Sequence, residues 1–190
     1  MSSSPLFGGW PVTRFAYALL IGVVGAGIVH IAILFLLPYL AERDAWSRMA
    51  ELGEVHETLM IEGEEANRLL ANPDPLFLAA ACRFDLDEGP VRIHAPDRVL
   101  FWSLSVYDRM GQNIFSLNDR TASEGQLDIV ILKPVQMLDL RHAFPEDFAT
   151  SIFVEADLEA GTAVIRSFLP DESWRSRVGD YLRSVSCDPY

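Results

Sequence analysis

The run from Phe15 to Leu37, which contains no charged residue, constrains this chain more than any other feature. A helix that crosses a bilayer needs about 20 mostly apolar residues, and this run is long enough. A signal-peptide core has roughly 7–15 apolar residues before a small-residue cleavage pattern, which is missing here. A buried core helix is the alternative, but nothing else in the chain could surround it. We therefore predict an uncleaved signal anchor, with residues 1–14 as a short tail and residues 15–40 as a single transmembrane segment.

Flanking positive charges give weak guidance on the orientation of this segment. Arg14 precedes it, and Arg43 and Arg48 follow it. The positive-inside rule therefore leans slightly against export of the C-terminal part. The N-terminal tail is short and carries a basic α-amino group, and long domains translocate largely regardless of charge. We expect the N-terminus in the cytoplasm and the domain outside.

One face of the predicted span carries small residues at regular spacing. Ala18, Gly22 and Ala26 recur every four residues, Gly25 lies beside them, and His30 is the next step. This spacing lets another helix approach closely, and a polar ring in a span should face protein. Three interpretations stay open: an ordinary helix with the histidine bonded to a carbonyl, a helix–helix interface, or a tetrapyrrole ligand. The last rests on Ala26-x-x-x-His30, which resembles the chlorophyll-binding spacing of bacterial antenna helices.

All acidic residues lie beyond the anchor, in the part of the chain that begins at Glu42. The whole chain has 27 Asp and Glu against 15 Lys and Arg, a formal charge of −12. Binding of nucleic acid needs clustered Lys and Arg, and acidic lipid headgroups repel an acidic domain. We therefore expect no nucleic-acid partner, and contact with the lipid bilayer through the anchor alone.

Residues 41–72 are predicted to form an amphipathic stalk helix that packs against the following domain. The segment Asn72-Pro-Asp-Pro75 ends it, because proline cannot continue a helix. Its apolar residues recur at three- and four-residue steps, as one face of a helix requires. These residues are Trp46, Met49, Leu52, Val55 and Leu59.

Residues 73–190 show the shorter alternation typical of strands. The clearest hairpin joins Val99–Tyr107 to Gln112–Leu117 through Asp108–Gly111, where Asp and Gly suit a type I turn. Leu127–Leu132 is nearly all apolar, as in a strand buried on both faces. Further elements are a strand in 76–86, a second hairpin from 151–156 and 162–169, a short helix in 134–147 and a closing helix in 174–185. We predict an α+β domain, mainly antiparallel β as a sandwich or open barrel with flanking helices, behind one N-terminal transmembrane helix.

Two cysteines, Cys82 and Cys187, lie far apart in the sequence. They form no C-x-x-C motif, which excludes a zinc or thioredoxin-like site on that pattern. In an exported domain a disulfide between them would tie the first strand to the C-terminus. Two separate thiols are the alternative, and the sequence does not decide between them.

No motif commits the domain to a chemistry. The sequence lacks H-E-x-x-H, G-x-S-x-G, P-loop and G-x-G-x-x-G patterns. Glu54-x-His56-Glu57 is the nearest approach to a metal cluster and fits a solvated helix face better. Ser103, His94 and Asp108 are a set that chance alone would supply. We expect no catalytic residues, metal or cofactor, and favour a binding role over an enzyme.

The densest polar residues lie at the predicted hairpin ends, where binding sites are common. Ordinary turn chemistry is the alternative, because Asn, Asp and Gly favour turns for local backbone reasons. The ligand-binding candidates are Trp102, Tyr107, Asp108, Asn113 and Arg120.

Several segments resemble bacterial membrane proteins of the domain-of-unknown-function 1254 group. They are Cys82-Arg-Phe-Asp-Leu86, Phe101-Trp-Ser-Leu-Ser-Val-Tyr-Asp108, Asn113-Ile-Phe-Ser-Leu-Asn-Asp-Arg-Thr121 and Val164-Ile-Arg-Ser-Phe-Leu-Pro170. The resemblance implies a single-pass protein of the bacterial inner membrane with a periplasmic domain. Larger relatives add a second β-rich domain of unknown function, numbered 1214, which implies that a separate membrane protein supplies it here. The family brings no activity or catalytic residues.

These observations favour a non-enzymatic binding or accessory module that faces the cell envelope and acts beside a membrane partner. One alternative is an envelope carrier of a small ligand, or an enzyme, with a pocket at the hairpin ends. Another is a small transmembrane subunit of a respiratory or photosynthetic complex, in which His30 and the small residues dock on the core.

Overall fold

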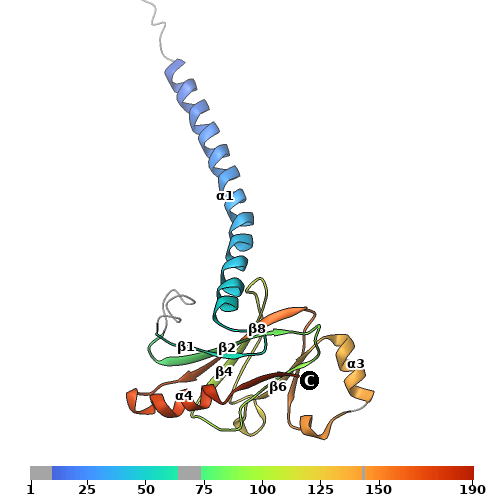
Figure 1. Ribbon diagram of the computed structural model, residues 1–190. Helices are drawn as coiled ribbons and strands as arrows, with labels where there is room; N and C mark the ends of the chain where they lie inside the picture. The colour runs from blue at the N-terminus through green and yellow to red at the C-terminus, as the bar shows by residue number, and fades with distance from the viewer. Residues whose placement is uncertain (1–9, 64–73, 143) are drawn as a thin grey trace, which may run out of the picture. The chain divides into compact units, whose positions relative to one another are not determined.

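The computed structural model describes residues 10–63, 74–142 and 144–190 (Figure 1). The chain divides into two compact units between Ala41 and Glu42. Helix α1 (Trp10–Leu52) makes up the described part of the first unit and ends inside the second. All the strands described belong to the second unit, which we call the domain.

The first unit contains a helix that is long and apolar enough to cross a membrane. This stretch, Val12–Leu37, has 26 residues and a mean hydropathy of 2.7. Every side chain in it is exposed. A signal sequence near an N-terminus passes the same test of length and composition, so the stretch is compatible with a membrane anchor or a signal sequence.

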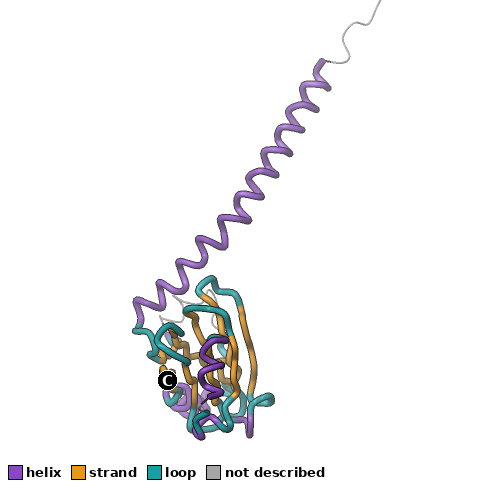
Figure 2. Tube along the Cα trace, turned by 90° about the vertical axis from the view of Figure 1, so that its right-hand side faces the viewer, coloured by secondary structure: helices purple, strands orange, loops and turns teal. Residues whose placement is uncertain are grey.

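The domain consists of two packed sheets, as the strands in Figure 2 show. Sheet A has the order β1-β2-β8-β4-β5, and sheet B has the order β7-β6-β3-β9. All pairs are antiparallel except β6 with β7. Neither sheet closes into a barrel, so the predicted α+β class with mainly antiparallel strands is confirmed. The bounds are β1 Thr58–Ile61, β2 Phe77–Asp85, β3 Val91–His94, β4 Trp102–Asp108, β5 Asn113–Asn118, β6 Asp128–Leu132, β7 Ile152–Glu155, β8 Ala160–Phe168 and β9 Ser186–Pro189.

The main core lies between the two sheets. Alternate residues of each strand point into it, because successive side chains of a strand face opposite sides. Phe84, Trp102 and Ile131 are among its fully buried members. A disulfide between Cys82 and Cys187 runs through this core, with a Cα–Cα distance of 6.5 Å. It joins β2 of sheet A to β9 of sheet B across 105 residues of sequence.

Two helices cover parts of the outer faces, and a third contributes to the main core. Helix α3 (Pro134–His142) packs Met137 and Leu140 against the outer face of β6, so this strand is buried on both faces as predicted. Met49, near the end of α1, packs on the outer face of sheet A with Ile61, Ala79 and Ala81. Helix α4 (Arg175–Arg183) adds Val178, Tyr181 and Leu182 to the main core.

The predicted stalk helix over residues 41–72 is wrong beyond Leu52. The Gly53 N–H donates to the Met49 carbonyl at 3.2 Å as the helix ends. Thr58–Ile61 is strand β1 at the edge of sheet A, with Leu59 opposite Ala81. Apolar residues at helical spacing are also compatible with a short strand. In the folded domain Thr58–Ile61 pairs with β2, so this segment is a strand and not a helix. The rest of this prediction, from residue 64, lies outside the described residues.

The second predicted hairpin is also wrong. Strand β7 joins sheet B and runs parallel to β6, whereas β8 lies in the middle of sheet A. The alternation of apolar residues identifies each strand but does not say which sheet it joins. The first hairpin is confirmed: β4 pairs with β5, and Gly111 N–H donates to the Asp108 carbonyl at 3.1 Å.

Candidate functional site

The five residues predicted at the hairpin ends fall into two groups. Trp102 begins β4 and Arg120 follows the end of β5, whereas Tyr107, Asp108 and Asn113 lie at the turn between the two strands. The length of β4 separates the groups by about 20 Å. The structure therefore does not bring the five residues to one pocket.

The first group serves the fold. Trp102 is fully buried, and its Nε1 donates to the Gly125 carbonyl at 2.9 Å. Arg120 is exposed, and its backbone N–H donates to the Asn118 side chain at 3.1 Å in a local turn. These contacts are the core packing and turn chemistry that such residues usually supply.

The second group lies on the outer face of sheet A. Asp108 Oδ1 accepts from the N–H groups of Met110 at 2.9 Å and Gln112 at 2.8 Å, which shapes the turn. Tyr107 pairs with Asn113 on one side and with Thr162 on the other. The result is a polar row across the sheet rather than a cavity.

Trp46 closes one end of this polar row. Its ring lies 5.2 Å from the guanidinium of Arg83 and 5.1 Å from that of Arg109. Arg83 is 6% exposed and donates from Nη2 to the Gly53 carbonyl at 2.6 Å. These contacts hold the end of α1 on sheet A, so the two arginines have a structural role here.

The histidine considered for a metal is engaged in the loop before β1. His56 Nδ1 lies 3.4 Å from Glu88 Oε2, and its Nε2 accepts from the Asp85 N–H at 3.3 Å. Glu57 Oε2 accepts from the Glu54 N–H at 2.9 Å. Within residues 10–63, 74–142 and 144–190, no group of three or more potential metal ligands comes together.

The small residues on one face of α1 are exposed. All five positions, Ala18, Gly22, Gly25, Ala26 and His30, are exposed. A Cβ added to either glycine would meet nothing within 4 Å among the described residues. The face therefore has room for another helix, and its use as an interface stays a prediction.

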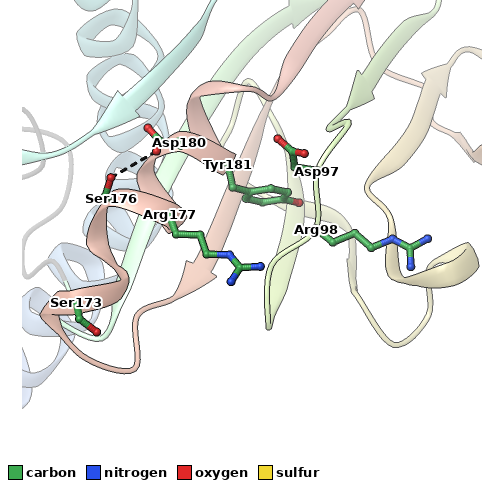
Figure 3. A pocket seen from close by; sticks show the side chains of 7 residues that line it. All are labelled: Asp97, Arg98, Ser173, Ser176, Arg177, Asp180 and Tyr181. Atoms are coloured by element: carbon green, nitrogen blue, oxygen red, sulfur yellow. Dashed lines mark hydrogen bonds between the residues drawn. The ribbon is translucent and has the colours of Figure 1, made fainter.

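A pocket that the sequence did not predict lies beside α4, and we call it the α4 pocket (Figure 3). Its volume is about 410 Å³. The lining comes from the segment after β3 and from the region of α4, which are distant in sequence. The lining residues are Asp97, Arg98, Ser173, Ser176, Arg177, Asp180 and Tyr181.

Tyr181 is the unusual member of the α4 pocket. It is 2% exposed, and its hydroxyl has no hydrogen-bond partner among the described residues. Burial and the nearby carboxylate of Asp119 raise the pKa of Tyr181 far above its ordinary value, so the phenol is neutral. Buried tyrosine hydroxyls usually find a partner. A tyrosine on the apolar face of the closing helix was the sequence signal that could have pointed here.

The charges in the α4 pocket are balanced. Arg98 donates to Glu124 at 3.0 Å, and Arg183 donates to Asp180 at 2.8 Å. The guanidinium of Arg177 lies over the Trp174 ring at 5.3 Å, and no side-chain hydrogen bond or ion pair joins it to the residues that the structure describes. The arrangement offers guanidinium donors, carboxylate acceptors and one unpaired hydroxyl, which can hold a polar molecule but form no recognised catalytic set.

Comparison with solved structures finds one that shares this fold and a second with a weaker likeness. The VPA0106 protein from Vibrio parahaemolyticus matches with a TM-score of 0.57 at 12% identity, over 80% of this chain and 36% of that one. A putative uncharacterized protein from Burkholderia cenocepacia matches with a TM-score of 0.46 at 16% identity, over 75% of this chain and 38% of that one. This chain therefore spans little more than a third of either protein.

No curated protein matches the sequence. Residues 57–189, which include all of β1 to β9, match the family described as "Protein of unknown function (DUF1254)". The domain of this chain therefore belongs to the DUF1254 family.

Proposed function

We propose that this chain is a non-enzymatic binding module, tethered by a single membrane span and acting beside a membrane partner. The observation that carries the proposal is the Val12–Leu37 stretch, whose apolar side chains are all exposed. Apolar surface of that extent is stable in lipid or against another protein, not in water. The continuous helix α1 joins this span to the domain, so the domain stays at the membrane surface.

The partner in this proposal is a membrane protein that contacts the small-residue face of α1. Gly22 and Gly25 leave the space that close helix packing requires, and His30 supplies a polar group on the same face. A separate chain carrying a domain of the 1214 type is the partner that the family resemblance suggests.

The proposed location is the bacterial inner membrane, with the N-terminus in the cytoplasm and the domain in the periplasm. The Cys82–Cys187 disulfide supports it, because such bonds persist in oxidising compartments and are rare in the cytosol. Mass spectrometry after alkylation of intact cells tests this orientation. We expect no alkylated cysteine without reduction, and two alkylated thiols would contradict a periplasmic domain.

The helix interface has a test with a matched control inside the chain. Gly22 and Gly27 are both open, but only Gly22 belongs to the small-residue face. Gly22→Leu should reduce crosslinking to the membrane partner about fivefold, because leucine prevents close approach of the helices. Gly27→Leu raises helix propensity equally and should leave crosslinking unchanged. Equal recovery with both variants, or no membrane protein above background with the native chain, would contradict the proposal.

A second candidate function, carriage of a small ligand in the envelope, is favoured by the α4 pocket rather than by the hairpin ends. The unpartnered Tyr181 hydroxyl is the observation that favours it. The remaining candidate is a subunit of a respiratory or photosynthetic complex, in which His30 and the small residues dock on the core. Co-purification in mild detergent tests it, and recovery of no subunit of such a complex would contradict it. An absorption spectrum of the same preparation tests the separate possibility that His30 holds a pigment.

A further inference from the structure

The α4 pocket places a polar atom where the protein offers it no partner. The Tyr181 ring extends from α4 toward the segment that carries Asp97 and Arg98 (Figure 3). Its hydroxyl is buried and unpaired among the described residues, and so is Oδ1 of the nearby Asp119. Two buried polar atoms without partners reduce stability unless something else bonds to them.

The hydroxyl is close to groups that can move. Asp97 and Arg98 are exposed, and the Arg98–Glu124 ion pair joins side chains that are 57% and 82% exposed. Such pairs contribute little to stability and break easily. A change of rotamer at Arg98 can therefore admit a ligand to Tyr181 without a rearrangement of the backbone.

The charges around the pocket select against an ionic ligand. The lining contains two guanidinium groups, Arg98 and Arg177, and two carboxylates, Asp97 and Asp180, so its formal charges balance. The carboxylate of Asp119 also lies near the tyrosine and would repel an anion there. The lining instead contains both donors and acceptors, which suits a ligand whose groups do both.

We propose that the α4 pocket binds a small neutral polyhydroxylated ligand, such as a monosaccharide or a cyclic polyol. Each hydroxyl of such a ligand donates one hydrogen bond and accepts others. Tyr181 and Arg177 donate to the ligand, and Asp97 and Asp180 accept from it. The volume of about 410 Å³ lies within the range of small-molecule sites. This proposal is independent of the membrane partner proposed above.

Titration of the full chain with a panel of ligands tests the proposal. The protein is kept in lauryldimethylamine oxide, because detergents with sugar headgroups would compete. Glucose, mannose, N-acetylglucosamine and myo-inositol are the polyol probes, and acetate and glycine probe for an anion and a zwitterion. Calorimetry should show saturable binding of at least one polyol with Kd of about 1 mM or tighter. Acetate and glycine should not bind.

Two variants and a control locate the binding. Tyr181→Phe should weaken binding about tenfold while the thermal midpoint stays the same or rises, because the lost hydroxyl has no protein partner. Arg177→Ala should weaken it similarly. Arg175→Gln is the control, since Arg175 is on the same helix but bonds to Glu172 and does not line the pocket.

Three results would overturn the proposal. They are the absence of saturable binding by every polyol, binding of acetate or glycine instead, and full affinity in Tyr181→Phe. If near-ultraviolet circular dichroism shows that Tyr181→Phe has not folded, Arg177→Ala decides. Weakened binding in that variant then supports the site, and unchanged binding overturns it.

Discussion

The chain has two apolar regions with opposite environments. Every side chain of Val12–Leu37 is exposed, whereas in β6 every residue is buried. Both segments are rich in Leu, Ile and Val, so composition does not separate them. The sheets bury their own apolar faces, whereas no described residue covers the apolar side chains of the helix. The comparison shows that the domain supplies its own apolar core, whereas the apolar surface of the span stays open in the described part of the chain.

The largest effect on the domain should come from removing the disulfide. Cys82→Ala combined with Cys187→Ala removes the crosslink between two residues that are 105 positions apart, so the unfolded chain gains conformational entropy. The double substitution also leaves space between the sheets. We expect a loss of about 4–5 kcal/mol of unfolding free energy, measured by urea titration. Membrane association should not change. A variant that leaves the membrane would show that the two regions are not independent.

The second change alters the span and leaves the domain as it is, by placing a charged residue among the apolar ones. Val24→Arg should weaken membrane insertion by about 2.5–3.5 kcal/mol, because charge is costly at the centre of a bilayer. Carbonate extraction of membranes measures the released fraction. The urea midpoint of the domain should stay that of the native chain. Val24→Leu is the matched control and should remain fully inserted.

A smaller loss should follow Asp128→Asn in sheet B. Burial disfavours the charge on Asp128. The hydrogen bonds from Arg92, at 2.8 and 2.9 Å, its positive charge and the nearby side chains of Ser151 and His94 together outweigh this effect and hold the pKa of Asp128 below its usual value. Arg92 is 28% exposed, so solvent partly screens its charge after Asp128 is neutralised. We therefore expect Asp128→Asn to lower the free energy of unfolding by about 1–2 kcal/mol at pH 7.

The pH dependence of this pair has a definite sign. A lowered folded pKa adds stability above the unfolded pKa of about 3.9, and this stability is lost as pH falls through the folded value. The difference between native and Asp128→Asn chains should therefore shrink below about pH 4. Asp157→Asn, at an exposed position, is the control. A difference that grows in acid would contradict the assignment.

The smallest effect should come at Trp46, which lies on the same helix as the span but belongs to the domain. Trp46→Leu removes the ring between Arg83 and Arg109 and should cost about 1 kcal/mol of domain stability. Arg109→Gln removes one of the two contacts and should cost less. Urea titration measures both, and a larger loss in the arginine variant would contradict the packing described.

Sequence patterns were most informative where one local rule decided the structure. The apolar run of the span, the Asp108–Gly111 turn and the doubly buried β6 each follow from residues close together in the chain. Strands β3 and β9, with four residues each, were not predicted from the sequence. Strand β1 was mistaken for helix because Leu59 fits both periods until its partner Ala81 is known.

The candidate site was harder to predict than the fold. Asp108 and Asn113 were predicted as ligand-binding residues because they are polar and lie beside a turn. In the structure their side chains make hydrogen bonds to residues close to them in the chain, Met110 and Ser116. The lining of the α4 pocket looks like an ordinary solvated surface in the sequence. Only the folded chain brings Asp97 beside Tyr181 and leaves the tyrosine hydroxyl without a partner.

Labelling of the full chain in native membranes with a photoactivatable lipid analogue tests the contrast between the two regions most directly. Peptide mass spectrometry then maps the adducts. We predict adducts within Val12–Leu37, because these side chains are exposed and apolar, and none on β2 or β6, whose residues are largely buried. Adducts on those strands, or an unlabelled span, would contradict the account.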